Sequence, residues 1–329
     1  MAEINFGGVA YSCREGETVL DALLRQDVEV PYSCKLGVCL SCLLRVESGT
    51  VPSEAQDGLR KTLCEQGYFL ACQCWPGDGL SIAGADQADV FSRAKVLEIE
   101  RLASNVCRVT LEPATPLYYH AGQFINLRRR DGLIRSYSLA SVPRLDPHLE
   151  LHVKRLPNGR MSNWIFDELS PGDSLDIQGP NGTCYYLPGN PSQSMLLIGN
   201  GTGLAPLVGI LRDTLNDGHE GPIFLYHGTR YKEGLYLRRE LEDLAVQHDN
   251  FRYSSCLSQD PNVTGCRSGR AEAVASAAHP DLTGWRVFLC GYPPMVHAAK
   301  KQAYLAGASL NDIHADPFEL CELRRAPRD

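Results

Sequence analysis

The alternation of hydrophobic and polar positions divides the chain into three segments. In the first, which ends near residue 85, short alternating runs predict strands, and apolar residues at helical spacing after Thr18 predict a helix capped by that threonine. Small and polar residues at 83–91 show no period and predict a linker. The predicted strands cover residues 4–6, 9–13, 43–46 and 69–74, and the predicted helix covers residues 19–25.

The second segment contains six short apolar runs separated by Pro, Gly and Asp turns. Short strands at this spacing predict a small antiparallel six-stranded barrel. They cover residues 96–102, 106–111, 123–127, 136–140, 149–153 and 174–178.

The third segment alternates strand-like and helix-like runs, which is typical of a doubly wound parallel sheet. Its strands are predicted at 195–199, 223–228, 251–257 and 287–290, with helices that include 237–246 and 294–305. The chain is therefore predicted to have several domains of α+β and α/β class. Their boundaries are expected at residues 1–88, 92–190 and 192–329.

Composition narrows the function classes. The 329 residues are 43% hydrophobic and 22% charged, as in ordinary globular proteins. The formal net charge of −7 argues against a nucleic-acid-binding protein, because such proteins concentrate positive charge. No apolar run approaches the roughly 20 residues that span a bilayer, and the first residues do not resemble a signal peptide. We expect a cytoplasmic protein that is a monomer and does not bind membranes.

The cysteines provide the first chemistry. A cytoplasmic chain with thirteen cysteines should hold them as thiols or ligands rather than disulfides. Cys34, Cys39 and Cys42 have the spacing C-x4-C-x2-C, and Cys72 follows after 29 residues. This is the plant-type spacing for a 2Fe–2S cluster. Gly37 lies inside the loop, where glycine allows positive φ and close approach of the backbone.

Two alternatives to this assignment remain at this point. Structural zinc sites favour two C-x2-C pairs, and here only Cys39 and Cys42 form one. Cys74 competes with Cys72 as the fourth ligand, since the two would share one face of the predicted strand. The 29-residue spacer favours Cys72.

The second segment contains residues suited to a flavin. Arg135 can neutralise a pyrophosphate, Tyr137 can cover an isoalloxazine ring, and Ser138 can hydrogen-bond near its N5. A glycine turn further on opens a predicted helix whose amides can bind phosphate, with Ser162 as its cap. The candidate flavin-binding residues are Arg135, Ser136, Tyr137, Ser138, His152, Val153, Gly159, Arg160, Met161 and Ser162.

The third segment contains a strand, a glycine turn and a helix start at residues 197–206. Glycines there let a pyrophosphate approach the backbone at a helix N-terminus. The pattern is G-x-G-x-G-x-x-P rather than G-x-G-x-x-G, because position 204 is Leu, so a Rossmann dehydrogenase is the wrong analogy. The candidate nucleotide-binding residues are Gly201, Thr202, Gly203, Pro206, Arg230, Cys290, Gly291 and Met295.

In this order the three segments resemble the reductase component of bacterial multicomponent oxygenases. Residues 1–85 resemble a plant-type ferredoxin, and the rest resembles the ferredoxin–NADP reductase superfamily. The resemblance implies FAD rather than FMN and places Thr202 and Cys290 near the nicotinamide, with Ser138, as the catalytic residues. It also implies that Phe318 covers the flavin, although this chain continues beyond that aromatic residue for eleven positions with a basic end.

The choice between NADH and NADPH depends on the end of the second strand of the third segment. Arg230 and Lys232 favour the extra phosphate of NADPH, while Glu233 disfavours it. The run Gly-Thr-Arg followed by Leu235 and Tyr236 resembles the members that use NADH. We expect NADH, with NADPH as the alternative.

The resemblance implies that a hydride passes from NADH to FAD and that single electrons leave through the cluster to an iron-containing oxygenase. The loop of residues 35–40, with Lys35, Leu36, Val38 and Leu40, is expected to form the docking face. An alternative acceptor is a deoxysugar dehydratase. An alternative function is that of a binding protein without turnover, but the intact motifs argue against it.

Overall fold

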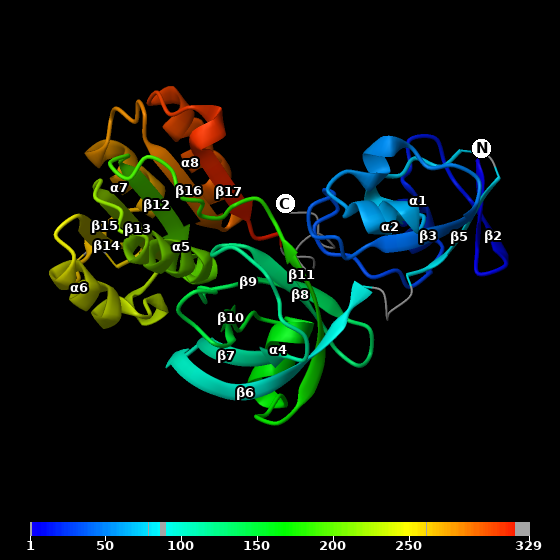
Figure 1. Cartoon of the computed structure of the whole chain (residues 1–329), viewed down its shortest axis with the longest axis horizontal. Helices are drawn as coiled ribbons and strands as arrows, with labels where there is room; N and C mark the ends of the chain where they lie inside the picture. Colours follow the sequence, from blue (N-terminus) through cyan, green and yellow to red (C-terminus); the bar gives the residue numbers. More distant parts are fainter. Residues whose placement is uncertain (1, 78, 86–89, 261, 320–329) are drawn as a thin grey trace.

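The computed structural model describes residues 2–77, 79–85, 90–260 and 262–319. The chain forms three domains in sequence order, and the middle domain contacts both others (Figure 1). The N-terminal domain holds the strands between residues 3 and 84, the middle domain those between 92 and 181, and the C-terminal domain those between 195 and 317. No helix in the described part of the chain combines the length and apolarity needed to cross a bilayer.

The N-terminal domain is a mixed sheet with short helices packed around it. Its elements are β1 (Glu3–Phe6), β2 (Val9–Ser12), α1 (Val19–Arg25), β3 (Leu43–Ser48), α2 (Lys61–Glu65), β4 (Tyr68–Leu70) and β5 (Leu80–Gly84). The strand order is β2-β1-β5-β3-β4, in which only β1 and β5 run parallel. The short turns η1 (Ser53–Gln56) and η2 (Ala71–Gln73) complete the domain.

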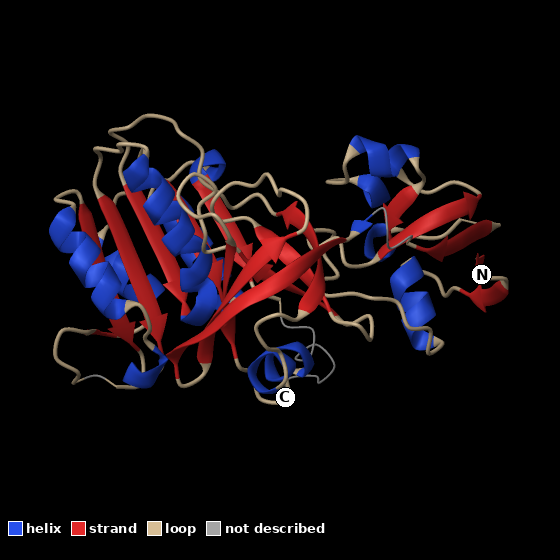
Figure 2. Ribbon diagram, turned by 60° about the horizontal axis from the view of Figure 1, so that its bottom comes forward, coloured by secondary structure: helices blue, strands red, loops and turns tan. Residues whose placement is uncertain are grey.

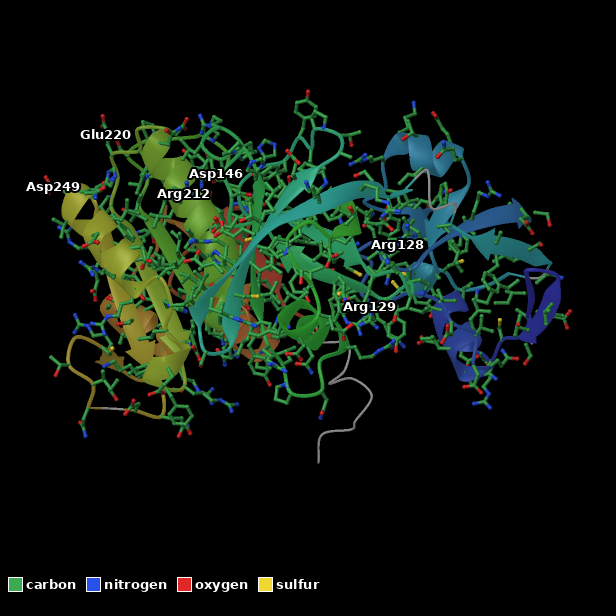
Figure 3. The ribbon with its side chains drawn as sticks, turned by 90° about the horizontal axis from the view of Figure 1, so that it is seen from below. Arg128, Arg129, Asp146, Arg212, Glu220 and Asp249 are labelled. Carbon is green, nitrogen blue, oxygen red and sulfur yellow. The ribbon has the colours of Figure 1, made fainter. Side chains whose placement is uncertain are left out.

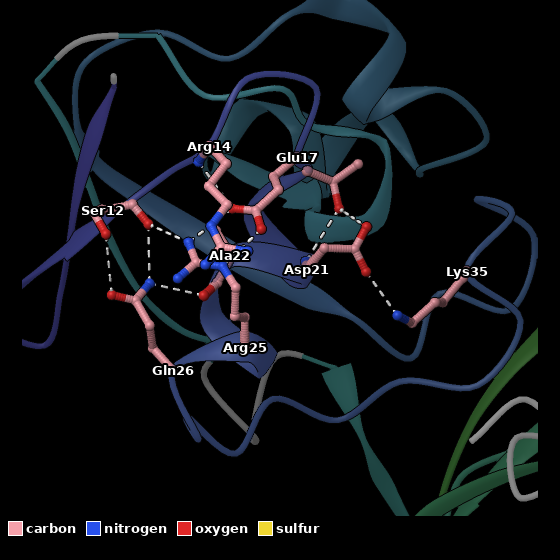
Figure 4. Close-up of polar contacts among 9 residues, drawn as sticks. Ser12, Arg14, Glu17, Asp21, Ala22, Arg25, Gln26 and Lys35 are labelled. Carbon is pink, nitrogen blue, oxygen red and sulfur yellow. Dashed lines mark hydrogen bonds and ion pairs between the residues drawn. The ribbon is translucent and has the colours of Figure 1, made fainter. Parts of the chain in front are cut away.

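Helix α1 is fixed at both ends by polar contacts (Figure 4). The Thr18 hydroxyl accepts from the Asp21 amide at 3.2 Å, which confirms the predicted cap. The Arg25 guanidinium pairs with Glu17 at 2.7 Å. Lys35 Nζ, from the cysteine loop, lies 2.7 Å from Asp21 Oδ1. The helix therefore anchors one side of the loop that carries the cysteines.

Two sequence predictions for this domain were wrong. The strand predicted over 69–74 ends at Leu70, because the chain turns into η2. The linker predicted over 83–91 overlaps β5, whose residue Ile82 is fully buried and pairs with both β1 and β3. Residues 86–89 of that linker lie outside the described residues.

The middle domain is the predicted six-stranded antiparallel barrel. The sheet order β10-β7-β6-β11-β8-β9 places β9 and β10 at its edges, and a bridge between Leu139 and Leu151 joins those edges. Helix α4 closes the core with the buried Met161, Ile165 and Phe166. The elements are β6 (Ser92–Ala103), β7 (Val106–Pro113), β8 (Phe124–Arg128), β9 (Ile134–Ser138), β10 (Leu149–Lys154), α4 (Arg160–Asp167) and β11 (Ser174–Asn181).

The C-terminal domain is the predicted parallel sheet. Its strands are β12 (Met195–Asn200), β13 (Ile223–Thr229), β14 (Phe251–Leu257), β15 (Arg267–Ser268), β16 (Arg286–Gly291) and β17 (Ile313–Pro317). Its helices are α5 (Leu204–Asn216), α6 (Arg238–Gln247), α7 (Ala271–Ala278) and α8 (Pro293–Leu305). Figure 2 shows these helices alongside the strands.

The sheet order of this domain, β15-β14-β13-β12-β16-β17, reverses direction at β12. One apolar cluster lies between the sheet and the first two helices, and a second lies between the sheet and the last two, so both faces are covered. In sheets of this kind, ligands bind where the order reverses, at the carboxyl ends of the strands. In this domain, that position lies just beyond the carboxyl ends of β12 and β16.

Candidate functional site

A cavity of about 1340 Å³ lies where the three domains meet. It is larger than an ordinary ligand pocket, which measures roughly 300–1,000 Å³. All three domains contribute side chains to its wall, so residues from the three predicted sites face one space. They include Cys34, Leu36, Val38 and Cys39, then Arg135, Ser136, Tyr137 and Ser138, and finally Gly201, Thr202, Arg230 and Phe318.

The first two cysteines of the loop form a thiol pair. The amides of Leu36 and Cys39 each donate to Cys34 Sγ at 3.3 Å, and the Cys34 amide donates to Cys39 Sγ at 3.3 Å. A hydrogen bond from the Cys39 thiol and the surrounding amides lower the pKa of Cys34. Gly37 has φ +79°, and a Cβ there would meet Gln73 Cγ at 2.9 Å, which confirms the need for glycine.

Cys42 and Cys72 form a second pair, in which a hydrogen bond from Cys42 lowers the pKa of Cys72. Each iron of a 2Fe–2S cluster takes two thiolates. Two pairs of buried thiols therefore suit a two-iron cluster better than they suit a single tetrahedral zinc ion. Cys74 does not join them. It is fully buried in the domain core near Cys13, and burial raises its pKa to about 12.

The predicted flavin motif lies on β9, facing the cavity. The Ser138 hydroxyl donates to Asp316 Oδ2 at 3.0 Å. The cavity wall keeps water from the Asp316 carboxyl and raises its pKa to about 6. Sequence reasoning missed Asp316, although it stands two residues before the predicted aromatic Phe318. The missed strand β17 brings it there, because its register pairs Asp316 with Cys290.

The helix after the glycine turn begins as required for an anion site, with one correction. Gly159 is the N-cap of α4, and no side chain caps it. Ser162, which we predicted as the cap, lies inside the first turn, where its hydroxyl accepts from the Leu156 amide at 3.1 Å. The start of α4 borders the cavity at Gly159, Met161 and Ser162, which suits a phosphate.

Three other predicted flavin-binding residues, His152, Val153 and Arg160, do not present a free side chain to the cavity. His152 lines the cavity, but its ring nitrogens contact Glu150 Oε1 at 2.8 Å and the Tyr236 hydroxyl at 3.2 Å. Burial lowers the pKa of His152, so the ring is neutral at physiological pH. The Val153 side chain lies in the apolar core of the barrel rather than in the cavity. Arg160, at the start of α4, is also outside the cavity wall.

The glycine turn after β12 packs tightly on the end of β16. A Cβ on Gly203 would lie 2.2 Å from the Cys290 carbonyl oxygen, and a Cβ on Gly291 would lie 2.2 Å from Asn200 Oδ1. These two glycines therefore let the two loops close on each other. Gly201 and Thr202 face the cavity, while Pro206 is buried in the first turn of α5.

Cys290 lies beneath the cavity floor and is fully buried. Its Sγ is 3.7 Å from Cys184 Sγ. Burial raises the pKa of Cys290, which keeps it a neutral thiol and fits a packing role better than a nucleophilic one. Met295, on α8, and Phe318 both line the cavity, and the Phe318 amide donates to the Gly291 carbonyl at 2.7 Å. The basic end of the chain, residues 320–329, lies outside the described residues.

Two basic side chains, Arg230 and Lys154, line the part of the cavity near the C-terminal domain. Arg230 follows β13, and Glu233 lies on the same stretch of wall. Lys154, which sequence reasoning did not select, extends from the end of β10 toward the glycine turn. Its Nζ lies 3.7 Å from where a Gly201 Cβ would be. Burial, with Arg230 nearby, lowers the pKa of Lys154. Two cations beside a helix start suit a diphosphate.

The junction between the middle and C-terminal domains is held by paired charges. Arg212 of α5 contacts both carboxylate oxygens of Asp146 at 2.8 Å, and Figure 3 shows the two side chains together. Arg144 reaches Asp213 at 2.7 Å and Asp217 at 3.0 Å. The apolar residues Val106, Cys184 and Tyr186 of the chain before β12 join the core of the C-terminal domain. This junction therefore combines partly exposed ion pairs with a shared apolar core.

The cysteine loop borders the cavity but is not enclosed by it, because Leu36 and Val38 are each 53% exposed. Leu36 and Val38, two of the four side chains predicted to form a docking face, line the cavity, while Lys35 turns to α1. The charge distribution is also uneven. Residues 1–90 hold six Lys and Arg against thirteen Asp and Glu, and the rest of the chain holds 26 of each. The whole net charge of −7 therefore belongs to the N-terminal domain and its linker.

Three family models match consecutive parts of the chain. They describe a 2Fe-2S iron-sulfur cluster binding domain over residues 3–77, an oxidoreductase FAD-binding domain over 93–186 and an oxidoreductase NAD-binding domain over 197–301. The chain therefore has domains for a 2Fe–2S cluster, FAD and NAD(P)H, as the motifs predicted.

Several relatives match almost the full length. The reductase subunit of an aromatic O-demethylase from Amycolatopsis is 36% identical over 327 residues, covering 96% of this chain and 98% of that protein. The reductase component of the naphthalene 1,2-dioxygenase/salicylate 5-hydroxylase systems from Ralstonia is 33% identical, covering 92% and 94%. The crystal structure of an Amycolatopsis cytochrome P450 reductase superposes with a TM-score of 0.70 at 35% identity, covering 97% and 99%.

Proposed function

The chain belongs to the family of ferredoxin-fused flavin reductases that are components of bacterial multicomponent oxygenases, and we propose that it transfers electrons from NADH to an oxygenase that acts on an aromatic compound. The observation that carries this proposal is the common cavity. Residues of the cysteine loop, of the predicted flavin strand and of the glycine turn all line this one cavity. FAD, when bound, accepts a hydride and releases electrons singly, which the one-electron cluster requires.

The hydride side of the site is built to position its ligands. Arg135 and the start of α4 are suited to the flavin pyrophosphate, and Tyr137 to the ring. Ser138 presents a hydroxyl whose direction Asp316 fixes. Thr202 and the glycine turn are placed for the nicotinamide nucleotide, above the neutral thiol of Cys290. Catalysis by such a site is mainly a matter of orientation.

The exit side is the N-terminal domain, with Cys34, Cys39, Cys42 and Cys72 as the cluster ligands. Because Leu36 and Val38 face the cavity, we place the docking face on the outer side of the loop, where Lys35 meets α1. The domain carries the net negative charge of the chain. A partner with a basic surface would be steered to it, and steering of this kind weakens with added salt.

The nucleotide is proposed to be NADH. Glu233 stands on the same wall as Arg230 and would disfavour the additional phosphate of NADPH. Lys154 and Arg230 together supply the charge that the shared diphosphate needs, so they do not by themselves select NADPH.

The test is an anaerobic titration of the purified holoprotein, followed by absorption. NADH should bleach the flavin and then the cluster, and NADPH should do so only at a much higher concentration. A protein that binds both groups but is not reduced by either nucleotide would refute the proposal. Reduction without transfer to an oxygenase, but with transfer to a dehydratase, would favour the alternative acceptor.

A further inference from the structure

A buried amide stands between the cluster loop and the flavin strand. Asn126 of β8 is fully buried. Its Nδ2 donates to the Cys39 carbonyl at 2.6 Å and to Gln178 Oε1, and its Oδ1 accepts from the Ser136 hydroxyl at 2.7 Å. One side chain thus joins the backbone of a proposed cluster ligand to the strand that carries the flavin motif.

The direction of this amide is fixed by its partners. Both Nδ2 hydrogens point at carbonyl oxygens, and Oδ1 faces a hydroxyl donor. Rotating the amide by half a turn would place Oδ1 against the oxygens of Cys39 and Gln178, leaving buried acceptors without donors. The three contacts therefore hold the Cys39 carbonyl at one position relative to Ser136.

The same face of β8 makes a second contact with the loop. Phe124 lies two residues before Asn126, on the same side of the strand, and packs with Cys34 and Cys39 in one apolar cluster. Arg128, two residues further on, has its guanidinium 4.0 Å from the centre of the Phe91 ring, at the end of the linker. Apolar packing excludes water but slides easily, whereas the Asn126 hydrogen bond is directional.

We propose that Asn126 is the positioning residue that holds the cluster loop, through the Cys39 carbonyl, against the flavin strand and so sets the rate of electron transfer to the cluster. The step moves one electron, which the bound flavin loses and the cluster gains, and no bond of the protein forms or breaks. This inference rests on the proposed function and adds to it the contact that couples the two redox groups.

The experiment uses stopped-flow absorption of the holoprotein mixed with NADH, in which flavin and cluster bleaching are followed separately. Asn126→Asp keeps the shape and the acceptor but loses the donor to Cys39. Asn126→Ser shortens the side chain so that no donor reaches the Cys39 carbonyl, without adding charge, and is measured in parallel because the aspartate variant could fail to fold. Ser141→Ala is the matched control, since it removes a fully buried hydrogen-bonding side chain of the same domain whose partners are Tyr119 and the Glu150 amide rather than the loop.

We expect cluster bleaching to slow by about 10-fold to 100-fold in both Asn126 variants, the usual effect of losing a contact behind a metal ligand. The rate of flavin bleaching and the KM for NADH should stay unchanged, and Ser141→Ala should resemble the parent. Hydrogen exchange of the amides around Cys39 should accelerate in the Asn126 variants, which is a readout independent of activity.

Parent-like cluster bleaching in a folded Asn126 variant would overturn the inference. So would an equal slowing of flavin and cluster bleaching, because Asn126 would then act on the flavin site itself. Failure of the proposed function looks different, since NADH would then leave the flavin of the parent protein oxidised.

Discussion

The two junctions of the middle domain are built in different ways. Toward the C-terminal domain, Arg212 and Arg144 each hold carboxylates, and apolar residues from both sides share one core. Toward the N-terminal domain, the described contacts are few: the Asn126 bond to Cys39, an exposed bond from Arg60 to the Gly179 carbonyl, and the packing of Phe124.

The difference follows from what each junction would have to do. Hydride transfer needs two rings at contact distance, where a displacement of 1 Å is costly, so a broad and rigid junction is expected there. Transfer of electrons to a partner needs a cysteine loop that is held at a fixed position against the middle domain. Its other side must remain accessible to the partner. A narrow junction with one buried hydrogen bond can satisfy both needs, and it should be easier to uncouple.

The largest effect is expected for Cys39→Ser. The variant should lose the cluster absorption and all electron delivery to a partner, because a serine hydroxyl does not replace a thiolate of the Cys34 pair. Reduction of small dyes by NADH should continue, since it depends only on the broad junction. Cys74→Ala, which alters a core cysteine of the same domain, should retain the cluster. Loss of dye reduction in folded Cys39→Ser would contradict the division of labour between the junctions.

The next largest effect concerns the hydride side. In Gly203→Ala the new methyl group would meet the Cys290 carbonyl at 2.2 Å and force the two loops apart. Flavin reduction by NADH should slow by about 100-fold, as expected for a displacement near 1 Å, and the visible spectrum of the cluster should be unchanged. Gly84→Ala, where a Cβ meets nothing within 4 Å, is the control. Rapid flavin reduction in Gly203→Ala would show that the close packing of these loops does not position the nucleotide.

A pH dependence should appear on the hydride side alone. The pKa of Asp316 is raised to about 6, so the carboxyl is protonated below that pH and can then donate to Ser138 Oγ. The Ser138 hydrogen is released for an acceptor in the cavity, and flavin reduction should become several-fold faster as pH falls through about 6. Stopped-flow rates between pH 5 and 8 would measure this, and Asp316→Asn should flatten the profile. An inflection that survives in Asp316→Asn would assign the titration to another group.

Much of this organisation could be predicted from the sequence, because spacing and period are local signals. The cysteine spacing identified the four thiols that the structure brings together as two pairs, and the glycine turn identified the nucleotide loop. Asp316 was missed because its strand is short and ends at Pro317, which weakens the strand signal in the sequence. Asn126 was missed because its neighbours Ile125 and Leu127 make it look like an ordinary strand position. The cap was assigned to Ser162 because serine is a good N-cap, but here the backbone places Gly159 at that position.

The smallest expected effects are changes in the free energy of unfolding, and they allow a direct comparison of the two junctions. Arg212→Met removes a paired, half-buried bidentate contact and should lower the free energy of unfolding by about 1–2 kcal/mol. Arg60→Ala removes an exposed contact of the narrow junction and should change it by less than about 0.5 kcal/mol. Thermal or urea unfolding, followed by the signals of both redox groups, would measure these changes. A double-mutant cycle of Arg212 with Asp146 would separate the pair from other contacts of each residue. If Arg60→Ala proved as destabilising as Arg212→Met, the N-terminal domain would be held by its exposed contact with Gly179. The narrow junction would then not depend on Asn126.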